Sequence, residues 1–288
     1  MKRPQAIAAA ALASLTLGSC GGEEGDSADE PIVSDPGPVH VHGLGVNPSD
    51  QSLFVATHTG LFRIPEGEQE ATRVGGNYQD TMGFTVVGPD RFLGSGHPDL
   101  RQDLPPFLGL IESKNAGREW KPRSLLGKAD FHMLEAAGDR VYGFGSDFKT
   151  RREQFLVSRD GGAEWRALDA PESLISLAIN PANPDELLAS GRHTLYGSSD
   201  SGTSWDPVTG EPGFVSWPDP DVLYLMAQDG RVGTTSEPGS EWTLKGSVDG
   251  TPAAFEAAGR DELYAALHDG SITESSDGGE SWTLRSSP

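Results

Sequence analysis

The sequence has little cysteine, little positive charge and a modest hydrophobic content. A single cysteine among 288 residues excludes a disulfide within the chain. Lysine and arginine number 22 against 43 aspartate and glutamate, a formal charge of −21, so phosphate backbones are repelled and a nucleic-acid partner is not expected. Hydrophobic residues make up only 35%, which argues against a polytopic membrane protein. The 37 glycines and 21 prolines favour many short elements joined by turns.

The first residues have the features of an export signal. Lys2 and Arg3 precede an apolar stretch from Ala6 to Leu17, which is too short to span a bilayer as a helix. It ends in Leu17-Gly18-Ser19-Cys20, which resembles the lipobox of bacterial lipoproteins. The resemblance implies a signal peptide at 1–19, a lipid on Cys20 and an extracytoplasmic protein anchored to a bacterial membrane, at the cell surface or in the periplasm. The alternative is an ordinary secretory signal with an incidental cysteine.

A short acidic segment separates this signal from the body of the protein. Residues 20–38 are rich in glycine, serine and proline and carry six acidic side chains. Low hydrophobicity and like charge favour an extended tether over a packed element. The sequence therefore predicts one folded domain over residues 39–288, expected to be a monomer.

The body contains five copies of one motif, Ser/Thr-x-Asp-x-Gly-x-x-Trp, with Asn or Glu in place of Asp in two copies. The distance from one motif tryptophan to the next is between 37 and 45 residues, which indicates a repeat architecture. The acidic or amide residue and the tryptophan of each copy are Asn115 and Trp120, Asp160 and Trp165, Asp200 and Trp205, Glu237 and Trp242, and Asp277 and Trp282.

These copies resemble the Asp-box (BNR) repeats of sialidases, sortilin-type receptors and photosystem II assembly-factor propellers. In such a turn the acid accepts backbone N–H groups, glycine supplies a positive φ and tryptophan starts the next strand. Asn115 and Glu237 depart from the pattern and predict looser turns. Each unit reads as four short strands, and a degenerate first unit brings the total to six. We therefore expect an all-β fold, a six-bladed β-propeller of four-stranded antiparallel blades with Asp-box turns.

The predicted topology brings all seven histidines to one end of the ring. Loops that enter the first strand of a blade share an end with loops between its second and third strands, and the Asp-boxes lie at the other end. Metal ligation by imidazoles and carboxylates, with zinc or copper as the ion, is one hypothesis for this end. A pocket for another small ligand and a purely structural role for the histidines are the alternatives. The candidate metal ligands are His42, His58, His97 and His132.

The two longest loops of the same end follow the second strands of blades 2 and 3, at residues 97–107 and 146–154. Long loops on a rigid scaffold often carry binding residues. Their charged side chains are the candidate ligand-binding residues: Asp99, Arg101, Asp147, Arg151 and Arg152. The leading hypothesis is a cell-surface binding module that uses its histidine-rich face on blades 1–3 to capture a small ligand or a metal.

An enzymatic alternative comes from resemblance alone. Phe62-Arg63-Ile64-Pro65 reproduces the FRIP sequence of sialidases, in which the arginine belongs to a triad that grips the substrate carboxylate. The position of Arg63 on a predicted third strand favours a structural role. Catalytic residues stay unknown, and an enzyme of this kind would be an exo-acting glycoside hydrolase that binds glycans. A third hypothesis is an extracytoplasmic assembly or scaffold protein.

Overall fold

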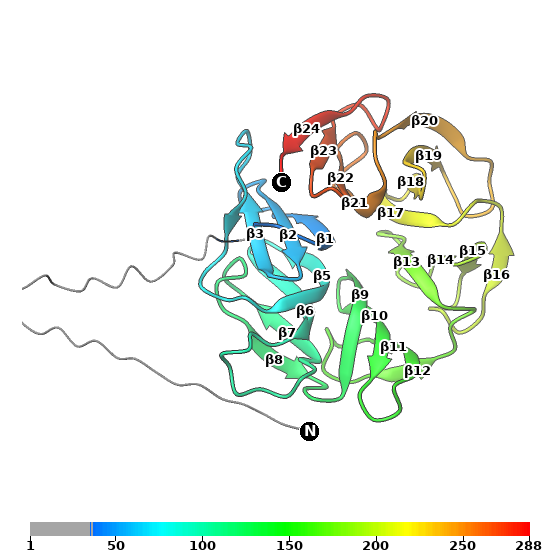
Figure 1. Ribbon diagram of the computed structural model, residues 1–288. Helices are drawn as coiled ribbons and strands as arrows, with labels where there is room; N and C mark the ends of the chain where they lie inside the picture. The colour runs from blue at the N-terminus through cyan, green and yellow to red at the C-terminus, as the bar shows by residue number, and fades with distance from the viewer. Residues whose placement is uncertain (1–34, 36) are drawn as a thin grey trace, which may run out of the picture. The chain divides into compact units, whose positions relative to one another are not determined.

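The computed structural model describes residue 35 and residues 37–288. The predicted signal peptide, Cys20 and nearly all of the predicted tether lie outside these residues. The described chain forms 24 strands in six four-stranded sheets, and each sheet is built from four strands that are consecutive in the sequence. The sheets follow one another around a ring as the blades of a propeller (Figure 1). The predicted six-bladed, all-β architecture is confirmed.

The strand bounds agree with the predicted repeat. In blades 1 to 3 the strands are β1 (Val41–Val46), β2 (Leu53–Thr57), β3 (Gly60–Ile64), β4 (Thr72–Arg73), β5 (Asp80–Gly88), β6 (Arg91–His97), β7 (Leu110–Ser113), β8 (Lys121–Ser124), β9 (Ala129–Ala137), β10 (Arg140–Asp147), β11 (Glu153–Ser158) and β12 (Arg166–Leu168). In blades 4 to 6 they are β13 (Leu174–Ile179), β14 (Leu187–Gly191), β15 (Leu195–Ser198), β16 (Asp206–Val208), β17 (Gly213–Asp219), β18 (Val222–Ala227), β19 (Arg231–Thr235), β20 (Thr243–Ser247), β21 (Pro252–Ala257), β22 (Leu263–Leu267), β23 (Ile272–Ser275) and β24 (Thr283–Ser286).

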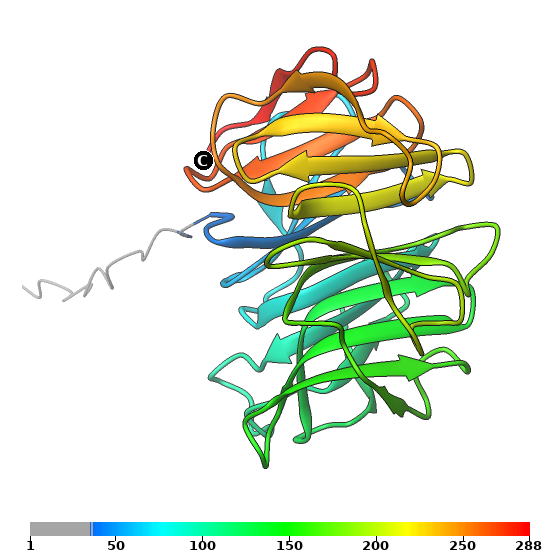
Figure 2. The ribbon, with the colours of Figure 1, turned by 90° about the vertical axis from the view of Figure 1, so that its right-hand side faces the viewer.

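Every blade is an antiparallel meander whose first strand lies nearest the ring axis (Figure 1). Each inner strand contacts the inner strand of the next blade, and β21 contacts β1, so the six inner strands surround a central space. Figure 2 shows the ring from the side, with the first described residues and the C-terminus on the same side of it. Among the described residues there is no helix of the length and apolar character that a membrane crossing requires.

The turns between third and fourth strands are held by the motif side chains. In blade 3, Asp160 Oδ1 accepts the backbone N–H groups of Ala163 and Glu164, both at 2.9 Å, and Ser158 Oγ accepts that of Gly162 at 2.8 Å. Gly162 has a φ of +89°, a conformation that side chains disfavour. The Asn115 turn keeps one of the two bonds, because its amide oxygen accepts the N–H of Glu119 at 2.9 Å, whereas the N–H of Arg118 donates to the Asn115 carbonyl at 3.3 Å, a partial loosening.

The Glu237 turn differs from the others. Its carboxylate accepts a hydrogen bond from the Ser240 hydroxyl at 3.1 Å, while the backbone N–H of Ser240 turns to the Glu237 carbonyl. Because the Glu237 side chain is longer than that of aspartate, its carboxylate extends beyond the backbone N–H groups of the turn. The looser turn predicted at Glu237 is therefore found.

Hydrophobic side chains pack between neighbouring blades in six separate clusters. Each motif tryptophan belongs to the cluster that its blade forms with the preceding one. Trp165 of blade 3, for example, packs on Phe131 with ring centroids 5.1 Å apart and donates to Ser124 Oγ of blade 2 at 2.9 Å. Each motif tryptophan therefore packs in the interface between its own blade and the preceding one.

The ring closes by side-chain contacts, without exchange of a strand. The sixth interface joins Val55 and Phe62 of blade 1 to Tyr264 and Ile272 of blade 6. The last strand adds polar bonds, since Arg285 donates to the Pro65 carbonyl at 2.6 Å and Ser286 Oγ donates to the Gln69 carbonyl at 2.7 Å.

Candidate functional site

Histidines occupy one repeated position at the end of the second strand of three blades. His58 and His268 directly follow β2 and β22, and His97 is the last residue of β6. His58 N–H donates to the His40 carbonyl at 3.2 Å, His268 N–H donates to the Thr251 carbonyl at 3.0 Å, and His97 pairs in register with Asp80. All three therefore lie at the end of the ring where the inner strands begin.

A second repeated position lies at a bulge in the inner strands. The register shifts after the first pair or pairs in β1, β5, β9, β13 and β21, which leaves one residue of each strand unpaired. A bulge of this kind turns a side chain out of the regular alternation. The unpaired residues are His42, Met82, His132, Ile175 and Ala253.

The two positions come together around Asp80 at the junction of blades 1 and 2. His58 Nδ1 lies 3.0 Å from Asp80 Oδ2, and His42 Nε2 lies 3.5 Å from Asp80 Oδ1. One ligand atom from each of the three side chains can be chosen so that all lie within 4.8 Å of one another. Asp80 is mostly buried, with 12% of its side chain exposed, whereas 61% of His58 is exposed. We call these three residues the Asp80 cluster.

Two atoms of the Asp80 cluster lack hydrogen-bond partners. His42 Nε2 and Asp80 Oδ1 are buried and face each other without forming a hydrogen bond. A buried polar atom without a partner costs about 1–3 kcal/mol, so such atoms are rare unless something else binds them. Ligand atoms around a tetrahedral Zn²⁺ lie roughly 3.3 Å apart, given metal–ligand distances of about 2.0–2.2 Å. The ligand atoms of the Asp80 cluster, which lie within 4.8 Å of one another, would have to move closer together to reach that geometry.

A second cluster of the same composition lies between blades 2 and 3. Asp130 Oδ2 is 3.0 Å from His132 Nε2 and 3.4 Å from His97 Nε2. The hydrogen bond that His132 donates to Asp130 raises the pKa of His132, against the opposing effect of partial burial. His97 Nδ1 donates to the Pro106 carbonyl at 2.8 Å, which fixes the orientation of its ring. The four predicted histidines thus divide into two pairs, each gathered around an aspartate.

The predicted binding residues Asp99 and Arg101 are bonded to each other. Asp99 is 5% exposed and accepts the backbone N–H groups of Tyr78 at 3.0 Å and Arg101 at 2.9 Å, together with the Arg101 guanidinium. The arginine hydrogen bonds hold the pKa of Asp99 well below its usual range. The Arg101 side chain also donates to the Gly76 carbonyl at 2.7 Å and lies over the Tyr78 ring. These bonds hold the blade 2 loop against the segment that precedes β5, at Gly76 and Tyr78.

The blade 3 loop is organised in its own way. Asp147 accepts the backbone N–H and hydroxyl of Thr150 at 2.6 and 2.7 Å, and these bonds lower its pKa. Arg151 lies over the rings of Phe107 and Phe148, which contact each other edge to face at 5.2 Å. Arg152 is exposed. The two long loops therefore contact through aromatic rings, and their charged groups do not converge on one point.

A pocket of about 420 Å³ adjoins the Asp80 cluster between the start of β1 and the end of β22. His40, His42 and His268 line it together with Val39 and Leu267. The pocket is a space beside His42 that a small molecule could fill.

The residues considered for glycoside hydrolysis are separated in the structure. Arg63 lies on β3, where its guanidinium pairs with Asp50 at 2.9 Å, as its structural interpretation predicted. Two further carboxylates, which the sequence places between the second and third strands of blades 5 and 6, are Asp229 and Asp269. They accept hydrogen bonds within their own turns, from Arg231 and Ser271 respectively, and these bonds lower both pKa values.

Sequence reasoning missed Asp80 and Asp130, the residues at the centre of the two clusters. A signal for them exists, because each stands two residues before the bulge of its inner strand, in the place that His40 holds in blade 1. An alignment of the repeats at that position would have found both.

Comparisons with known proteins identify solved structures of similar fold. No family model and no curated protein sequence matches the chain. A structure described as YCF48 bound to D1 peptide matches at a TM-score of 0.53 and 15% identity, covering 86% of this chain and 83% of the other. YCF48 from Cyanidioschyzon merolae matches at 0.50 and 15%, covering 88% and 86%. An ancestral GH74 enzyme matches at 0.50 and 15%, covering 83% of this chain but 37% of the enzyme. These likenesses show the fold.

Proposed function

We propose that this protein is a lipid-anchored, extracytoplasmic binding module that holds a divalent transition-metal ion in the Asp80 cluster. The observation that carries the proposal is the convergence of two imidazole nitrogens and a carboxylate oxygen within 4.8 Å, with two buried atoms that lack partners. Their chemistry fits zinc or copper, because both ions accept imidazole and carboxylate ligands.

The arrangement favours a site that keeps a coordination position open. Three protein ligands leave the fourth position of a tetrahedral ion for water or a bound molecule. Exposed His58 lies on the solvent side of the cluster, and the pocket beside His42 could hold a small ligand of that ion. Capture of a metal, and of a small molecule through the metal, is therefore the function that this geometry supports best.

The proposed extracytoplasmic, lipid-anchored location rests on residues 1–20. The basic start, the short apolar stretch and Leu17-Gly18-Ser19-Cys20 support export and lipid attachment at Cys20. Radiolabelled palmitate added to producing bacterial cells should label the chain, and C20S should abolish the label. Labelling that persists in C20S would contradict the anchor.

The metal proposal is tested by calorimetric titration of metal-free protein with Zn²⁺ and with Cu²⁺. We expect one high-affinity equivalent, weakened at least 100-fold by H42A and by D80N. The matched control is H193A, which removes an exposed histidine of blade 4 that pairs with Glu172 and should leave this affinity unchanged. H97A tests whether the metal binds instead at the cluster around Asp130, to which His97 belongs. Equal affinity in D80N and the parent, or loss of the high-affinity equivalent in H97A alone, would contradict the assignment.

The glycoside hydrolase alternative has less support. A general acid needs a raised pKa, whereas Asp99, Asp147, Asp229 and Asp269 form local bonds that lower theirs. Their positions suit the stabilisation of turns and loops.

A further inference from the structure

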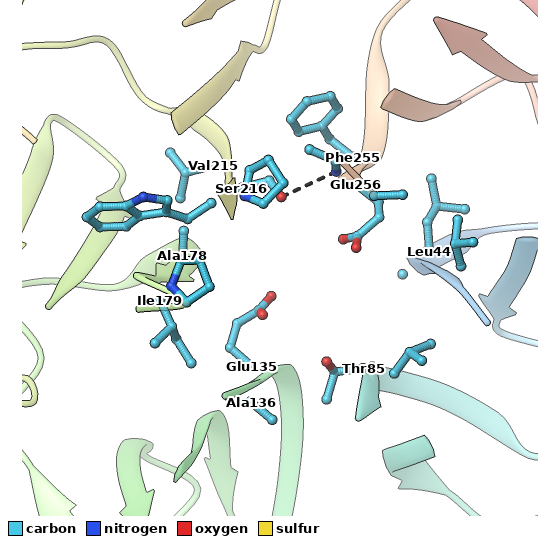
Figure 3. A pocket seen from close by; sticks show the side chains of 18 of the residues that line it. Leu44, Thr85, Glu135, Ala136, Ala178, Ile179, Val215, Ser216, Phe255 and Glu256 are labelled. Carbon is cyan, nitrogen blue, oxygen red and sulfur yellow. Dashed lines mark hydrogen bonds between the residues drawn. The ribbon is translucent and has the colours of Figure 1, made fainter. Parts of the chain in front are cut away.

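A separate cavity of about 480 Å³ lies on the ring axis, lined by the later halves of the inner strands. In the Asp80 cluster, His42 and Asp80 lie at the starts of β1 and β5, so the cluster and the cavity occupy different levels of the ring. Figure 3 shows the Glu135 and Glu256 carboxylates pointing toward one another across this cavity. They come from β9 and β21, which belong to blades 3 and 6 on opposite sides of the ring.

The repeat explains why the two carboxylates meet. Glu135 pairs in register with Tyr142, and Glu256 with Tyr264, so they hold the same position in their blades. In the other four blades this position carries a residue with a small or short side chain: Gly45, Thr85, Ala178 and Ser216. The ring at this level therefore consists of two acids facing each other with open space between them.

Neither carboxylate has a partner in the described part of the chain. No hydrogen bond or ion pair joins Glu135 or Glu256 to another described residue. Lysine, arginine and histidine are absent from the residues that line the cavity. Glu262 is the third titratable lining residue, and it already accepts a hydrogen bond from the Tyr264 hydroxyl at 2.6 Å.

The electrostatics of the pair agree with this geometry. Desolvation raises the pKa of Glu256 to about 8. Desolvation, with the nearby Glu256 as a lesser cause, raises the pKa of Glu135 well above its usual value. Two partly buried acids without a counter-charge are unfavourable when ionised, and a bound cation would relieve that cost.

The walls around the pair indicate what kind of cation fits. Leu44, Ile179, Val215 and Trp217 line the cavity but supply only a minor apolar share of a mostly polar surface, because each of these residues is less than a tenth exposed. Calcium requires six to eight oxygen ligands, more than two carboxylates and the hydroxyls of Thr85 and Ser216 readily supply. We propose that this cavity binds a compact organic cation, a primary ammonium or guanidinium group with a short apolar body, through Glu135 and Glu256.

The proposal is tested by calorimetric titration of the purified protein with n-butylammonium chloride at pH 8.5, with n-butanol as the uncharged probe of equal shape. We expect saturable binding of n-butylammonium and none of n-butanol. E135Q and E256Q should each weaken binding at least tenfold, while the exposed-surface control E164Q should leave it unchanged. Binding should weaken as the pH falls from 8.5 to 6.5, because the cavity acids take up protons.

Three further results would overturn the proposal. Absence of saturable binding at pH 8.5, or equal binding to the parent and to the double variant E135Q/E256Q, would remove the organic-cation site. Tighter binding of Ca²⁺ than of n-butylammonium, lost in the same double variant, would assign the pair to a metal ion instead. If the double variant fails to fold, as judged by circular dichroism, the comparison of n-butylammonium with n-butanol and the pH series on the parent protein decide the question. The Asp80 cluster is untouched in these variants, so the outcome is independent of the metal proposal.

Discussion

Replacement of Glu256 by glutamine should make the protein more stable at alkaline pH and leave it nearly unchanged at acid pH. The pKa of Glu256 is raised from its usual 4.5 to about 8 by desolvation in the central cavity. Between these values the folded protein keeps a proton that the unfolded chain loses. Stability therefore falls as the pH rises from 4.5 to 8, and it levels off above 8.

The magnitude follows from the two pKa values. The interval between 4.5 and about 8 corresponds to at most about 5 kcal/mol of lost stability, at about 1.4 kcal/mol for each pH unit. Solvent in the cavity screens part of this penalty, so we expect E256Q to gain about 2–4 kcal/mol over the parent at pH 8.5. At pH 5 the carboxyl is neutral in the folded protein, and the two proteins should agree to within about 1 kcal/mol.

The assay is urea unfolding at pH 5, 6.5 and 8.5, followed by tryptophan fluorescence. Urea is preferred because guanidinium belongs to the class of cation proposed for the cavity. E164Q is the matched control, since Glu164 lies exposed in a turn far from the cavity. A stability difference between E256Q and the parent that does not change with pH would refute the reasoning, because it would mean that Glu256 titrates normally.

Three other predictions concern the ring and the second histidine cluster. W165A should cost about 3 kcal/mol in urea unfolding because it opens a cavity between blades 2 and 3, and W165F should cost less. D200A should lower the melting temperature in calorimetry by about 3–5 °C, whereas E237A should change it little, because only Asp200 accepts backbone N–H groups of its turn. D130N should lower the pKa of His132 in an NMR titration, and an unchanged value would show that another group raises it.

The fold could be predicted because its determinants are local. A serine, an acid, a glycine and a tryptophan at fixed spacing form one turn and the start of one strand. Five copies of this motif indicate the repeat. For the last blade the sequence predicts strands at 252–257, 262–267, 271–275 and 282–286, and β21–β24 differ from these by at most one residue at each end. Register within a blade follows from these short turns, so the common end of the histidines could also be predicted.

The chemistry of the sites depends on contacts between blades, which sequence spacing does not encode. His42 and His58 meet Asp80 of the next blade, while His132 meets Asp130 of its own strand. His42 and His132 occupy the same bulge position, and their partners differ because blade 1 carries His40 where blade 3 carries Asp130. The pairing of Glu135 with Glu256 required knowledge of which blades lie opposite. The length of the two loops likewise gave no sign that Asp99 and Asp147 bond to groups within a few residues of themselves.

The most direct test of the account is a crystal structure of the protein grown with one equivalent of Zn²⁺, with anomalous data collected on both sides of the zinc absorption edge. The account predicts a single strong zinc peak about 2.0–2.2 Å from His42 Nε2, His58 Nδ1 and an oxygen of Asp80. A fully zinc-loaded crystal with no peak there, or with its strongest peak beside His97 and His132, would contradict it.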